Sequence, residues 1–151
     1  MKTASKLAFV AVVASCSFSA LAEQADVKVT ASVIGNCRIM NIEDINFGAL
    51  DPAQASDQKA EGNVEFACTK NIDYKLSADQ GQHFNRETGK RQMNEGEENL
   101  PYSLDKDEFA GRGAGFSNPM KVSLNATVYG RDYRDLPALS YSDTLRLTLL
   151  P

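Results

Sequence analysis

Alternation of apolar and polar residues with a period of two is the feature that most limits how this chain can fold. In a β-strand successive side chains point to opposite faces, so each alternating run has one face suited to burial and one suited to water. No window of eleven or more residues carries the apolar period of a helix. The pattern therefore predicts an all-β chain. The alternating runs are residues 26–34, 63–68, 72–78, 121–128 and 144–149.

Turn-forming residues separate these runs. Asp51-Pro52, Glu61-Gly62 and Asn118-Pro119 are examples, and residues 51–60 have room for one helical turn at most. Several short strands at fairly even spacing, with turns between them, are typical of a β-sandwich or barrel. The sequence has no internal repeat and no low-complexity linker, so we expect a single domain.

Residues 1–22 predict a secretory signal peptide. Lys2 and Lys6 form a basic head, residues 7–14 are apolar, and Ala20-Leu21-Ala22 gives the small-x-small pattern of a cleavage site. The apolar run is far shorter than the ~20 residues of a membrane-spanning helix. Cleavage removes two lysines and no acid, so the net charge moves from −4 to −6. An acidic chain does not suit nucleic acid, because phosphate binding needs Lys and Arg.

The three cysteines divide between the signal and the mature chain. Cys37 and Cys68 remain after cleavage, and an even pair in an oxidising compartment predicts a disulfide. A redox pair is disfavoured because the spacing is not C-x-x-C. Residues 13–16 also fit the pattern that precedes a lipidated cysteine, and Cys16 would then be the acylated first residue of a membrane-anchored protein.

The residues that usually carry chemistry do not form a recognisable site. His83 is the only histidine, and no metal-ligand spacing surrounds it. The chain has no G-x-S-x-G nucleophile motif. The glycine-rich stretch 111–115 lacks the Lys-Ser/Thr of a phosphate-binding loop, so we interpret it as a turn. We therefore expect no enzyme, no catalytic residue, no cofactor and no metal.

The two ends of the mature chain are less ordinary. The run 26–34 begins only a few residues after the cleavage site, and the last run ends at Leu149-Leu150, just before Pro151. A sandwich that ends on an apolar strand can leave an open sheet edge, which can pair with another chain. Alternatively, the first run pairs within its own sheet and the sandwich is complete. The pattern alone leaves both alternatives open.

The C-terminal part of the chain carries a recognisable pattern at residues 128–131, 136–138 and 141–145. It resembles the C-terminal signature of the spore coat protein U domain, a family that includes the archaic, Csu-type chaperone–usher pilins. The chain departs from the family pattern at Ser140, where glycine is usual, and at the terminal Pro151. The other similar segments are residues 26–32, 46–51, 62–69 and 100–104.

The resemblance implies an immunoglobulin-like β-sandwich that lacks its last strand and is completed by a donor strand. A periplasmic chaperone would supply that strand first, and the N-terminal segment of another subunit would replace it at the outer-membrane usher. Residues 23–36 would then be the donor segment and residues 37–151 the domain. The donor side chains would be Val27, Val29, Ala31 and Val33, and the edge of the acceptor groove would be formed by Leu145, Leu147 and Leu149.

The function implied is that of a structural pilin subunit. It would be exported to the periplasm and polymerised by donor-strand exchange into surface fibres for adhesion and biofilm formation. Its partners would be identical or homologous pilins, the chaperone and the usher. Two alternatives stay open, namely a non-polymerising spore coat or envelope protein and an adhesin that binds glycans or surfaces.

Overall fold

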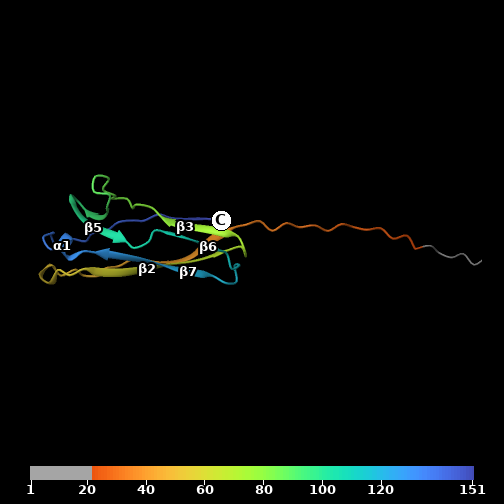
Figure 1. Cartoon of the computed structure of the whole chain (residues 1–151), viewed down its shortest axis with the longest axis horizontal. Helices are drawn as coiled ribbons and strands as arrows, with labels where there is room; N and C mark the ends of the chain where they lie inside the picture. The colour runs from red at the N-terminus through yellow and green to blue at the C-terminus, as the bar shows by residue number, and fades with distance from the viewer. Residues whose placement is uncertain (1–21) are drawn as a thin grey trace, which may run out of the picture. The chain divides into compact units, whose positions relative to one another are not determined.

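The structure is a computed structural model that describes residues 22–151, so Cys16 and nearly all of the predicted signal peptide lie outside the described residues. Within them, eight strands form two antiparallel sheets of an immunoglobulin-like sandwich, which confirms the predicted all-β class (Figure 1). The elements are β1 (Cys37–Glu43), η1 (Pro52–Gln54), β2 (Gln58–Cys68), β3 (Asp73–Ala78), β4 (Arg91–Glu95), β5 (Glu98–Leu104), β6 (Glu108–Arg112), β7 (Met120–Val128), α1 (Gly130–Tyr133) and β8 (Leu147–Leu150).

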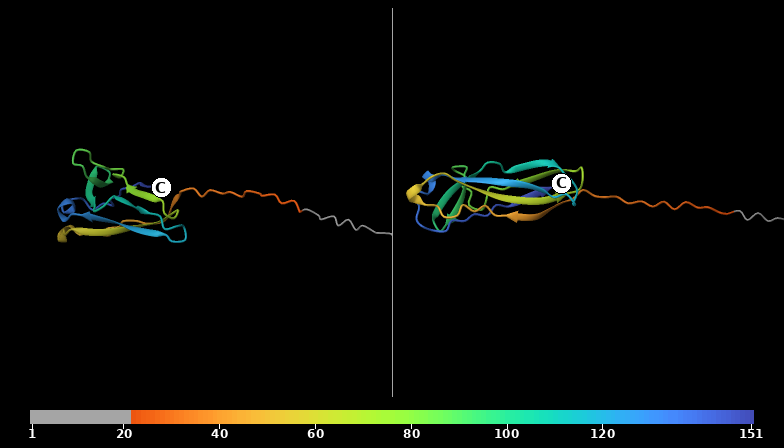
Figure 2. Two further views of the ribbon diagram at one scale, coloured as in Figure 1. Left: turned by 45° about the vertical axis from the view of Figure 1, so that its right-hand side comes forward. Right: turned by 90° about the horizontal axis from the view of Figure 1, so that it is seen from below.

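The strand order places β1 and β8 at sheet edges. One sheet has the order β1-β2-β7-β5-β4 and the other has the order β6-β3-β8. Figure 2 gives two further views of the sandwich that they form. The free side of β4 is bridged by Ser142, which exchanges backbone hydrogen bonds with Asn94. β1 pairs only with β2, and β8 only with β3, in the part of the chain that the structure describes.

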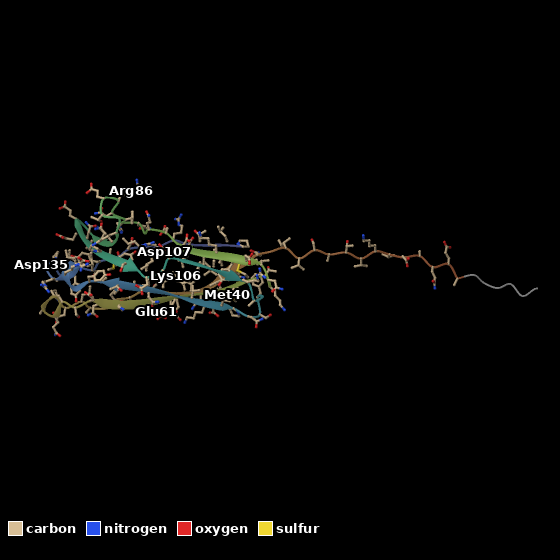
Figure 3. The ribbon with its side chains drawn as sticks, in the orientation of Figure 1. Met40, Glu61, Arg86, Lys106, Asp107 and Asp135 are labelled. Carbon is tan, nitrogen blue, oxygen red and sulfur yellow. A yellow bond between two sulfur atoms is a disulfide. The ribbon has the colours of Figure 1, made fainter. Side chains whose placement is uncertain are left out.

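The core lies between the two sheets and has two parts. Val64 and Phe66 of β2 are fully buried, and Phe66 packs edge-on against Tyr74 with 4.9 Å between ring centroids. The polar alternates of the same strand point to solvent, as Glu61 does (Figure 3). The first cluster comprises Val64, Phe66, Cys68, Leu76 and Leu124, and the second comprises Leu100, Tyr102, Val128 and Tyr133.

A β-bulge at Met40 shapes β1. Ile39 lies opposite Phe66 and Ile42 lies opposite Val64, so one extra residue separates them on the β1 side. The bulge allows both isoleucines to face the core side although they are three residues apart, and Met40 is left 53% exposed. Alternation is therefore interrupted in β1, and the sequence pattern did not predict this strand.

The predicted disulfide is present. Cys37 and Cys68 are paired in register between β1 and β2, with 2.02 Å between their sulfur atoms. Beside it, Thr69 N–H donates to Asn36 O at 2.9 Å, and Asn36 N–H donates to Thr69 Oγ1 at 3.0 Å. These bonds and the disulfide fix the chain at Asn36 and Cys37, where β1 begins.

Three predicted runs differ from the structure by more than one residue. The run 26–34 forms no strand, because alternation gives it a strand-like pattern but no neighbouring strand pairs with its backbone. β2 begins at Gln58, five residues before the predicted start, and β8 covers Leu147–Leu150, so Leu145 precedes it. Apart from β1, the short strands β4 and β6 were also missed. β4 is polar except for Met93, and in β6 only Phe109 is partly buried, so neither shows alternation.

Replacing both Cys37 and Cys68 by Ser should lower the free energy of unfolding. The bridge closes a loop across 31 positions of sequence, and chain entropy assigns such a loop roughly 3–4 kcal/mol. Urea unfolding followed by circular dichroism measures the change. Reduced wild-type protein is the control and should lose a similar amount. Equal stability of the oxidised wild type and the double variant would contradict this role.

Candidate functional site: an open groove between two sheet edges

The edges β1 and β8 lie next to each other without pairing. They belong to different sheets, yet residues of the two strands are in contact. Each strand has its partner on the far side, so the unpaired N–H and C=O groups of both are directed toward the gap between them. In an open sandwich such an edge is a template for another strand. The gap has two edges of this kind along its length.

A cavity of about 430 Å³ lies at one end of this gap. Ile42 and Ile45 line it from the β1 side, and Leu145 and Leu147 line it from the β8 side. Leu124, from the buried core, lies at its floor. The core is therefore not covered by backbone on this side, which leaves 51% of Ile42 exposed although it faces inward.

A second cavity, of about 620 Å³, continues the first beyond the ends of the strands. It lies between the loop that follows β1 and the loop that follows α1. Its lining is mainly apolar and includes Leu50, Leu100 and Leu136. The residues that line both cavities are Ile45, Phe47, Met93 and Tyr141. We call the gap and its two cavities the groove.

The structure brings the three predicted edge residues together on one side of the groove. Leu145, Leu147 and Leu149 are all partly buried, and the residues between them are exposed. Leu147 and Leu149 pack against the first core cluster, and Leu145 packs against the second. Leu149 lies opposite the buried Leu76 in the ladder between β3 and β8.

The four predicted donor residues lie in an extended segment without secondary structure. Val27, Val29 and Val33 are 86%, 90% and 90% exposed, and Ala31 is also exposed. Ile34, which the prediction did not include among the donor side chains, is 76% exposed as well. Residues 22–32 belong to a unit separate from the domain of residues 33–151. Apolar side chains that are exposed together, as these are, are typical of interaction sites.

A buried carboxylate that the sequence reasoning missed adjoins the groove. Asp143 Oδ2 accepts a hydrogen bond from the Tyr102 hydroxyl at 2.6 Å, and both residues line the first cavity. Burial, together with the Asp143 carboxylate, raises the pKa of Tyr102 well above its usual range. His83 Nδ1 lies 3.1 Å from Asp143 Oδ1, so this histidine has a structural partner. The only sequence signal was the position of Asp143 inside the C-terminal signature.

Other kinds of site have little support. Residues 22–151 contain no group of three or more His, Cys, Asp or Glu placed to hold a metal ion. None of the helices in the described part of the chain has the length and apolar character needed to cross a membrane. What the geometry offers instead is a long apolar groove with two unpaired strand edges, which is suited to binding an extended peptide.

Comparison with known proteins identifies the class. The family model of the Spore Coat Protein U domain matches residues 23–148, and the chain therefore belongs to this family. No curated protein matches the chain. One similar solved structure is described as the CsuC-CsuE chaperone-tip adhesion subunit pre-assembly complex from archaic chaperone-usher Csu pili of Acinetobacter baumannii. The similarity covers 78% of this chain and 40% of that chain, at 19% identity and a TM-score of 0.49.

Alkaline pH should destabilise the protein through Tyr102. In the folded state its raised pKa keeps the hydroxyl protonated, whereas in the unfolded chain a tyrosine ionises near pH ~10. The unfolded state then binds fewer protons, so the free energy of unfolding falls as pH rises above about 10. Tyr102→Phe should reduce that slope by up to about 1.4 kcal/mol per pH unit. Urea unfolding between pH 8 and 11.5 measures it.

Tyr129→Phe is the matched control, because it removes a hydroxyl that has no hydrogen bond to Asp143. Its pH slope should equal that of the wild type. A Tyr102→Phe variant with an unchanged alkaline slope would show that the Asp143–Tyr102 bond does not hold the proton.

Proposed function

We propose that this protein is a structural subunit of a chaperone–usher fibre, in which residues 23–36 of one copy complete the sandwich of the next. One observation carries the proposal. The domain has two facing, unpaired strand edges over an apolar groove, and the same chain has an exposed, alternating apolar segment. The acceptor and the donor are therefore both encoded in one sequence.

A strand inserted between β1 and β8 would satisfy backbone groups on both of its sides. Its alternate side chains would point into the groove, because they project from a strand every second residue. Val27, Val29, Ala31 and Val33 have that spacing. At ~1–3 kcal/mol for each fully buried valine, the hydrophobic contribution would be several kcal/mol. The residues of the acceptor edge would be Leu145, Leu147 and Leu149.

The domain also favours one direction for the donor strand. The chain joins its own domain at the Cys37 end of β1, and β8 runs antiparallel to β1, with Leu145 near the opposite end. A donor antiparallel to β8 would enter from that opposite end, so successive domains would follow one another in a line. A parallel donor would bring its domain to the end that the acceptor's own extension already occupies.

Export and assembly follow from the family resemblance. The signal peptide would direct the chain to the periplasm, where a chaperone would supply a temporary strand to the groove. At an outer-membrane usher, the extension of another pilin would replace it, and the fibre would appear on the cell surface. The protein would act in adhesion and biofilm formation by forming the fibre, without catalysis or a cofactor.

Deletion of residues 26–33 should leave a subunit that is chaperone-bound but cannot donate a strand. We expect fibres to be lost when the variant is produced with its chaperone and usher, as measured by electron microscopy and by a ladder of multimers on unheated denaturing gels. Normal fibres from the deletion variant would overturn the proposal.

A sharper test changes one face of the segment at a time. Replacing Val27, Val29 and Val33 by Ser should abolish the ladder, because the side chains that fill the groove are gone. The control replaces Lys28 and Thr30 by Ser, which alters the face expected to remain in solvent. This control should polymerise as the wild type does. Equal effects of the two sets would show that the segment is only a tether.

A further inference from the structure

We infer that Thr69 is a positioning residue, one that keeps the donor segment from folding back into the groove of its own domain. The inference rests on the proposed function, since a segment that fills its own groove cannot serve another copy. Within one chain the effective concentration of segment and groove is on the order of millimolar, so pairing within a chain competes strongly with pairing between copies.

Thr69 pairs with Asn36 at the point where the segment joins β1. Thr69 N–H donates to Asn36 O at 2.9 Å, and Thr69 Oγ1 accepts from Asn36 N–H at 3.0 Å. Cys37 and Cys68 are the next pair in the ladder between β1 and β2. Asn36 and Thr69 therefore extend that ladder by one position, which directs the chain away from a turn at Asn36.

The two residues before Asn36 are restrained as well. The Thr69 hydroxyl has two carbonyl acceptors within reach, Asn36 O at 3.3 Å and Ile34 O at 3.4 Å. A Cβ on Gly35 would lie 3.4 Å from Ile72 Cγ2, so the backbone passes close to the Ile72 side chain there. Residues 34–36 are thus held against the domain, with Thr69 at the centre of the contacts.

Folding back would turn the segment into a hairpin with β1, in which residues directly opposite each other share a face. Ile39 of β1 packs on the core side. A turn made of residues 34–35 leaves the bonds of Thr69 intact but places Thr30 opposite Ile39. The polar face of the segment would then enter the apolar groove, which is a register error of one residue.

A turn made of residues 34–36 would correct the face, because it places Ala31 opposite Ile39. Gly35-Asn36 suits such a turn, since three-residue hairpin loops commonly end on a residue in the left-handed region, which asparagine tolerates. The turn uses Asn36, however, so its hydrogen bonds to Thr69 would have to break.

A turn made of residues 33–35 also brings the apolar face inward and leaves Asn36 in place. It removes Val33 from the groove, and it places two β-branched residues, which favour strands, in the turn. Thr69 therefore opposes the short turn that would keep all four alternating side chains in the groove of the same chain.

The test measures whether the groove of a monomer is free. A fluorescein-labelled peptide of residues 23–36 is titrated against monomers of the mature chain at low concentration, and binding is followed by fluorescence anisotropy. Thr69→Val removes the hydroxyl and keeps a β-branched side chain of similar shape. We expect this variant to bind the peptide roughly tenfold more weakly than the wild type, since apparent affinity falls with the fraction of open grooves.

The same two proteins without residues 26–33 make the result specific. Neither chain then carries a segment that folds back, so Thr69→Val should change the affinity for the peptide by less than roughly twofold. A merely structural role of Thr69 would weaken binding equally with and without the segment, and that result would overturn the inference.

A second variant acts on the other side of the same pairing. Asn36→Gly removes the side chain that accepts a hydrogen bond from Cys37 N–H at 2.8 Å, and glycine makes a turn easier. It should also lose affinity for the peptide only when the segment is present. This variant takes the place of Thr69→Val if that protein does not fold.

Asp57→Ala is the matched control. The Asp57 carboxylate also binds backbone across two segments, accepting from Gly130 N–H at 3.0 Å, but it makes no hydrogen bond to residues 34–36. The control should bind the peptide as the wild type does, and a loss equal to that of Thr69→Val would contradict the inference. Failure of the proposed function looks different, because the peptide would then not bind even the wild-type chain that lacks residues 26–33.

Discussion

The unpaired backbone of β1 and β8 is the constraint on which the rest of the structure depends. Peptide N–H and C=O groups at a sheet edge need partners, and an edge left open invites another strand. Here two such edges face one groove, and core residues such as Leu124 form its floor. The disulfide between β1 and β2 lies at one end of the groove, and the hydrogen bond between Asp143 and Tyr102 lies at the other.

Sequence reasoning predicted the strands in which apolar and polar residues alternate without interruption. β2, β3 and β7 alternate cleanly, and the cysteine pair followed from the predicted export. β1 was missed because the bulge at Met40 breaks its period. β4 was missed because its residues are polar except for Met93, and β6 because it is short and only Phe109 in it is partly buried. The approach of β1 to β8 and the hydrogen bonds of Asp143 to Gln82 and Tyr102 join segments far apart in sequence, which no local pattern can indicate.

If the segment of one copy fills the groove of another, the stability of each domain depends on its neighbour. The proposed interface would be heterologous, since one surface of the first copy would bind a different surface of the second, and such contacts extend into filaments instead of closing. The exposed valines of the segment and the uncovered core of the groove would then be the two sides of one contact between copies. Stability of the domain would depend on occupancy of the groove, and hence on the concentration of partner strands.

Period-two alternation also creates an ambiguity of register. A shift of one residue would turn the apolar face to solvent and is strongly disfavoured. A shift of two residues keeps the apolar face inward, and three of the four proposed donor side chains are the same residue, so hydrophobic burial alone would distinguish such registers poorly. The register would therefore depend on differences along the groove, such as the change from the apolar Leu145 to the buried, hydrogen-bonded Asp143.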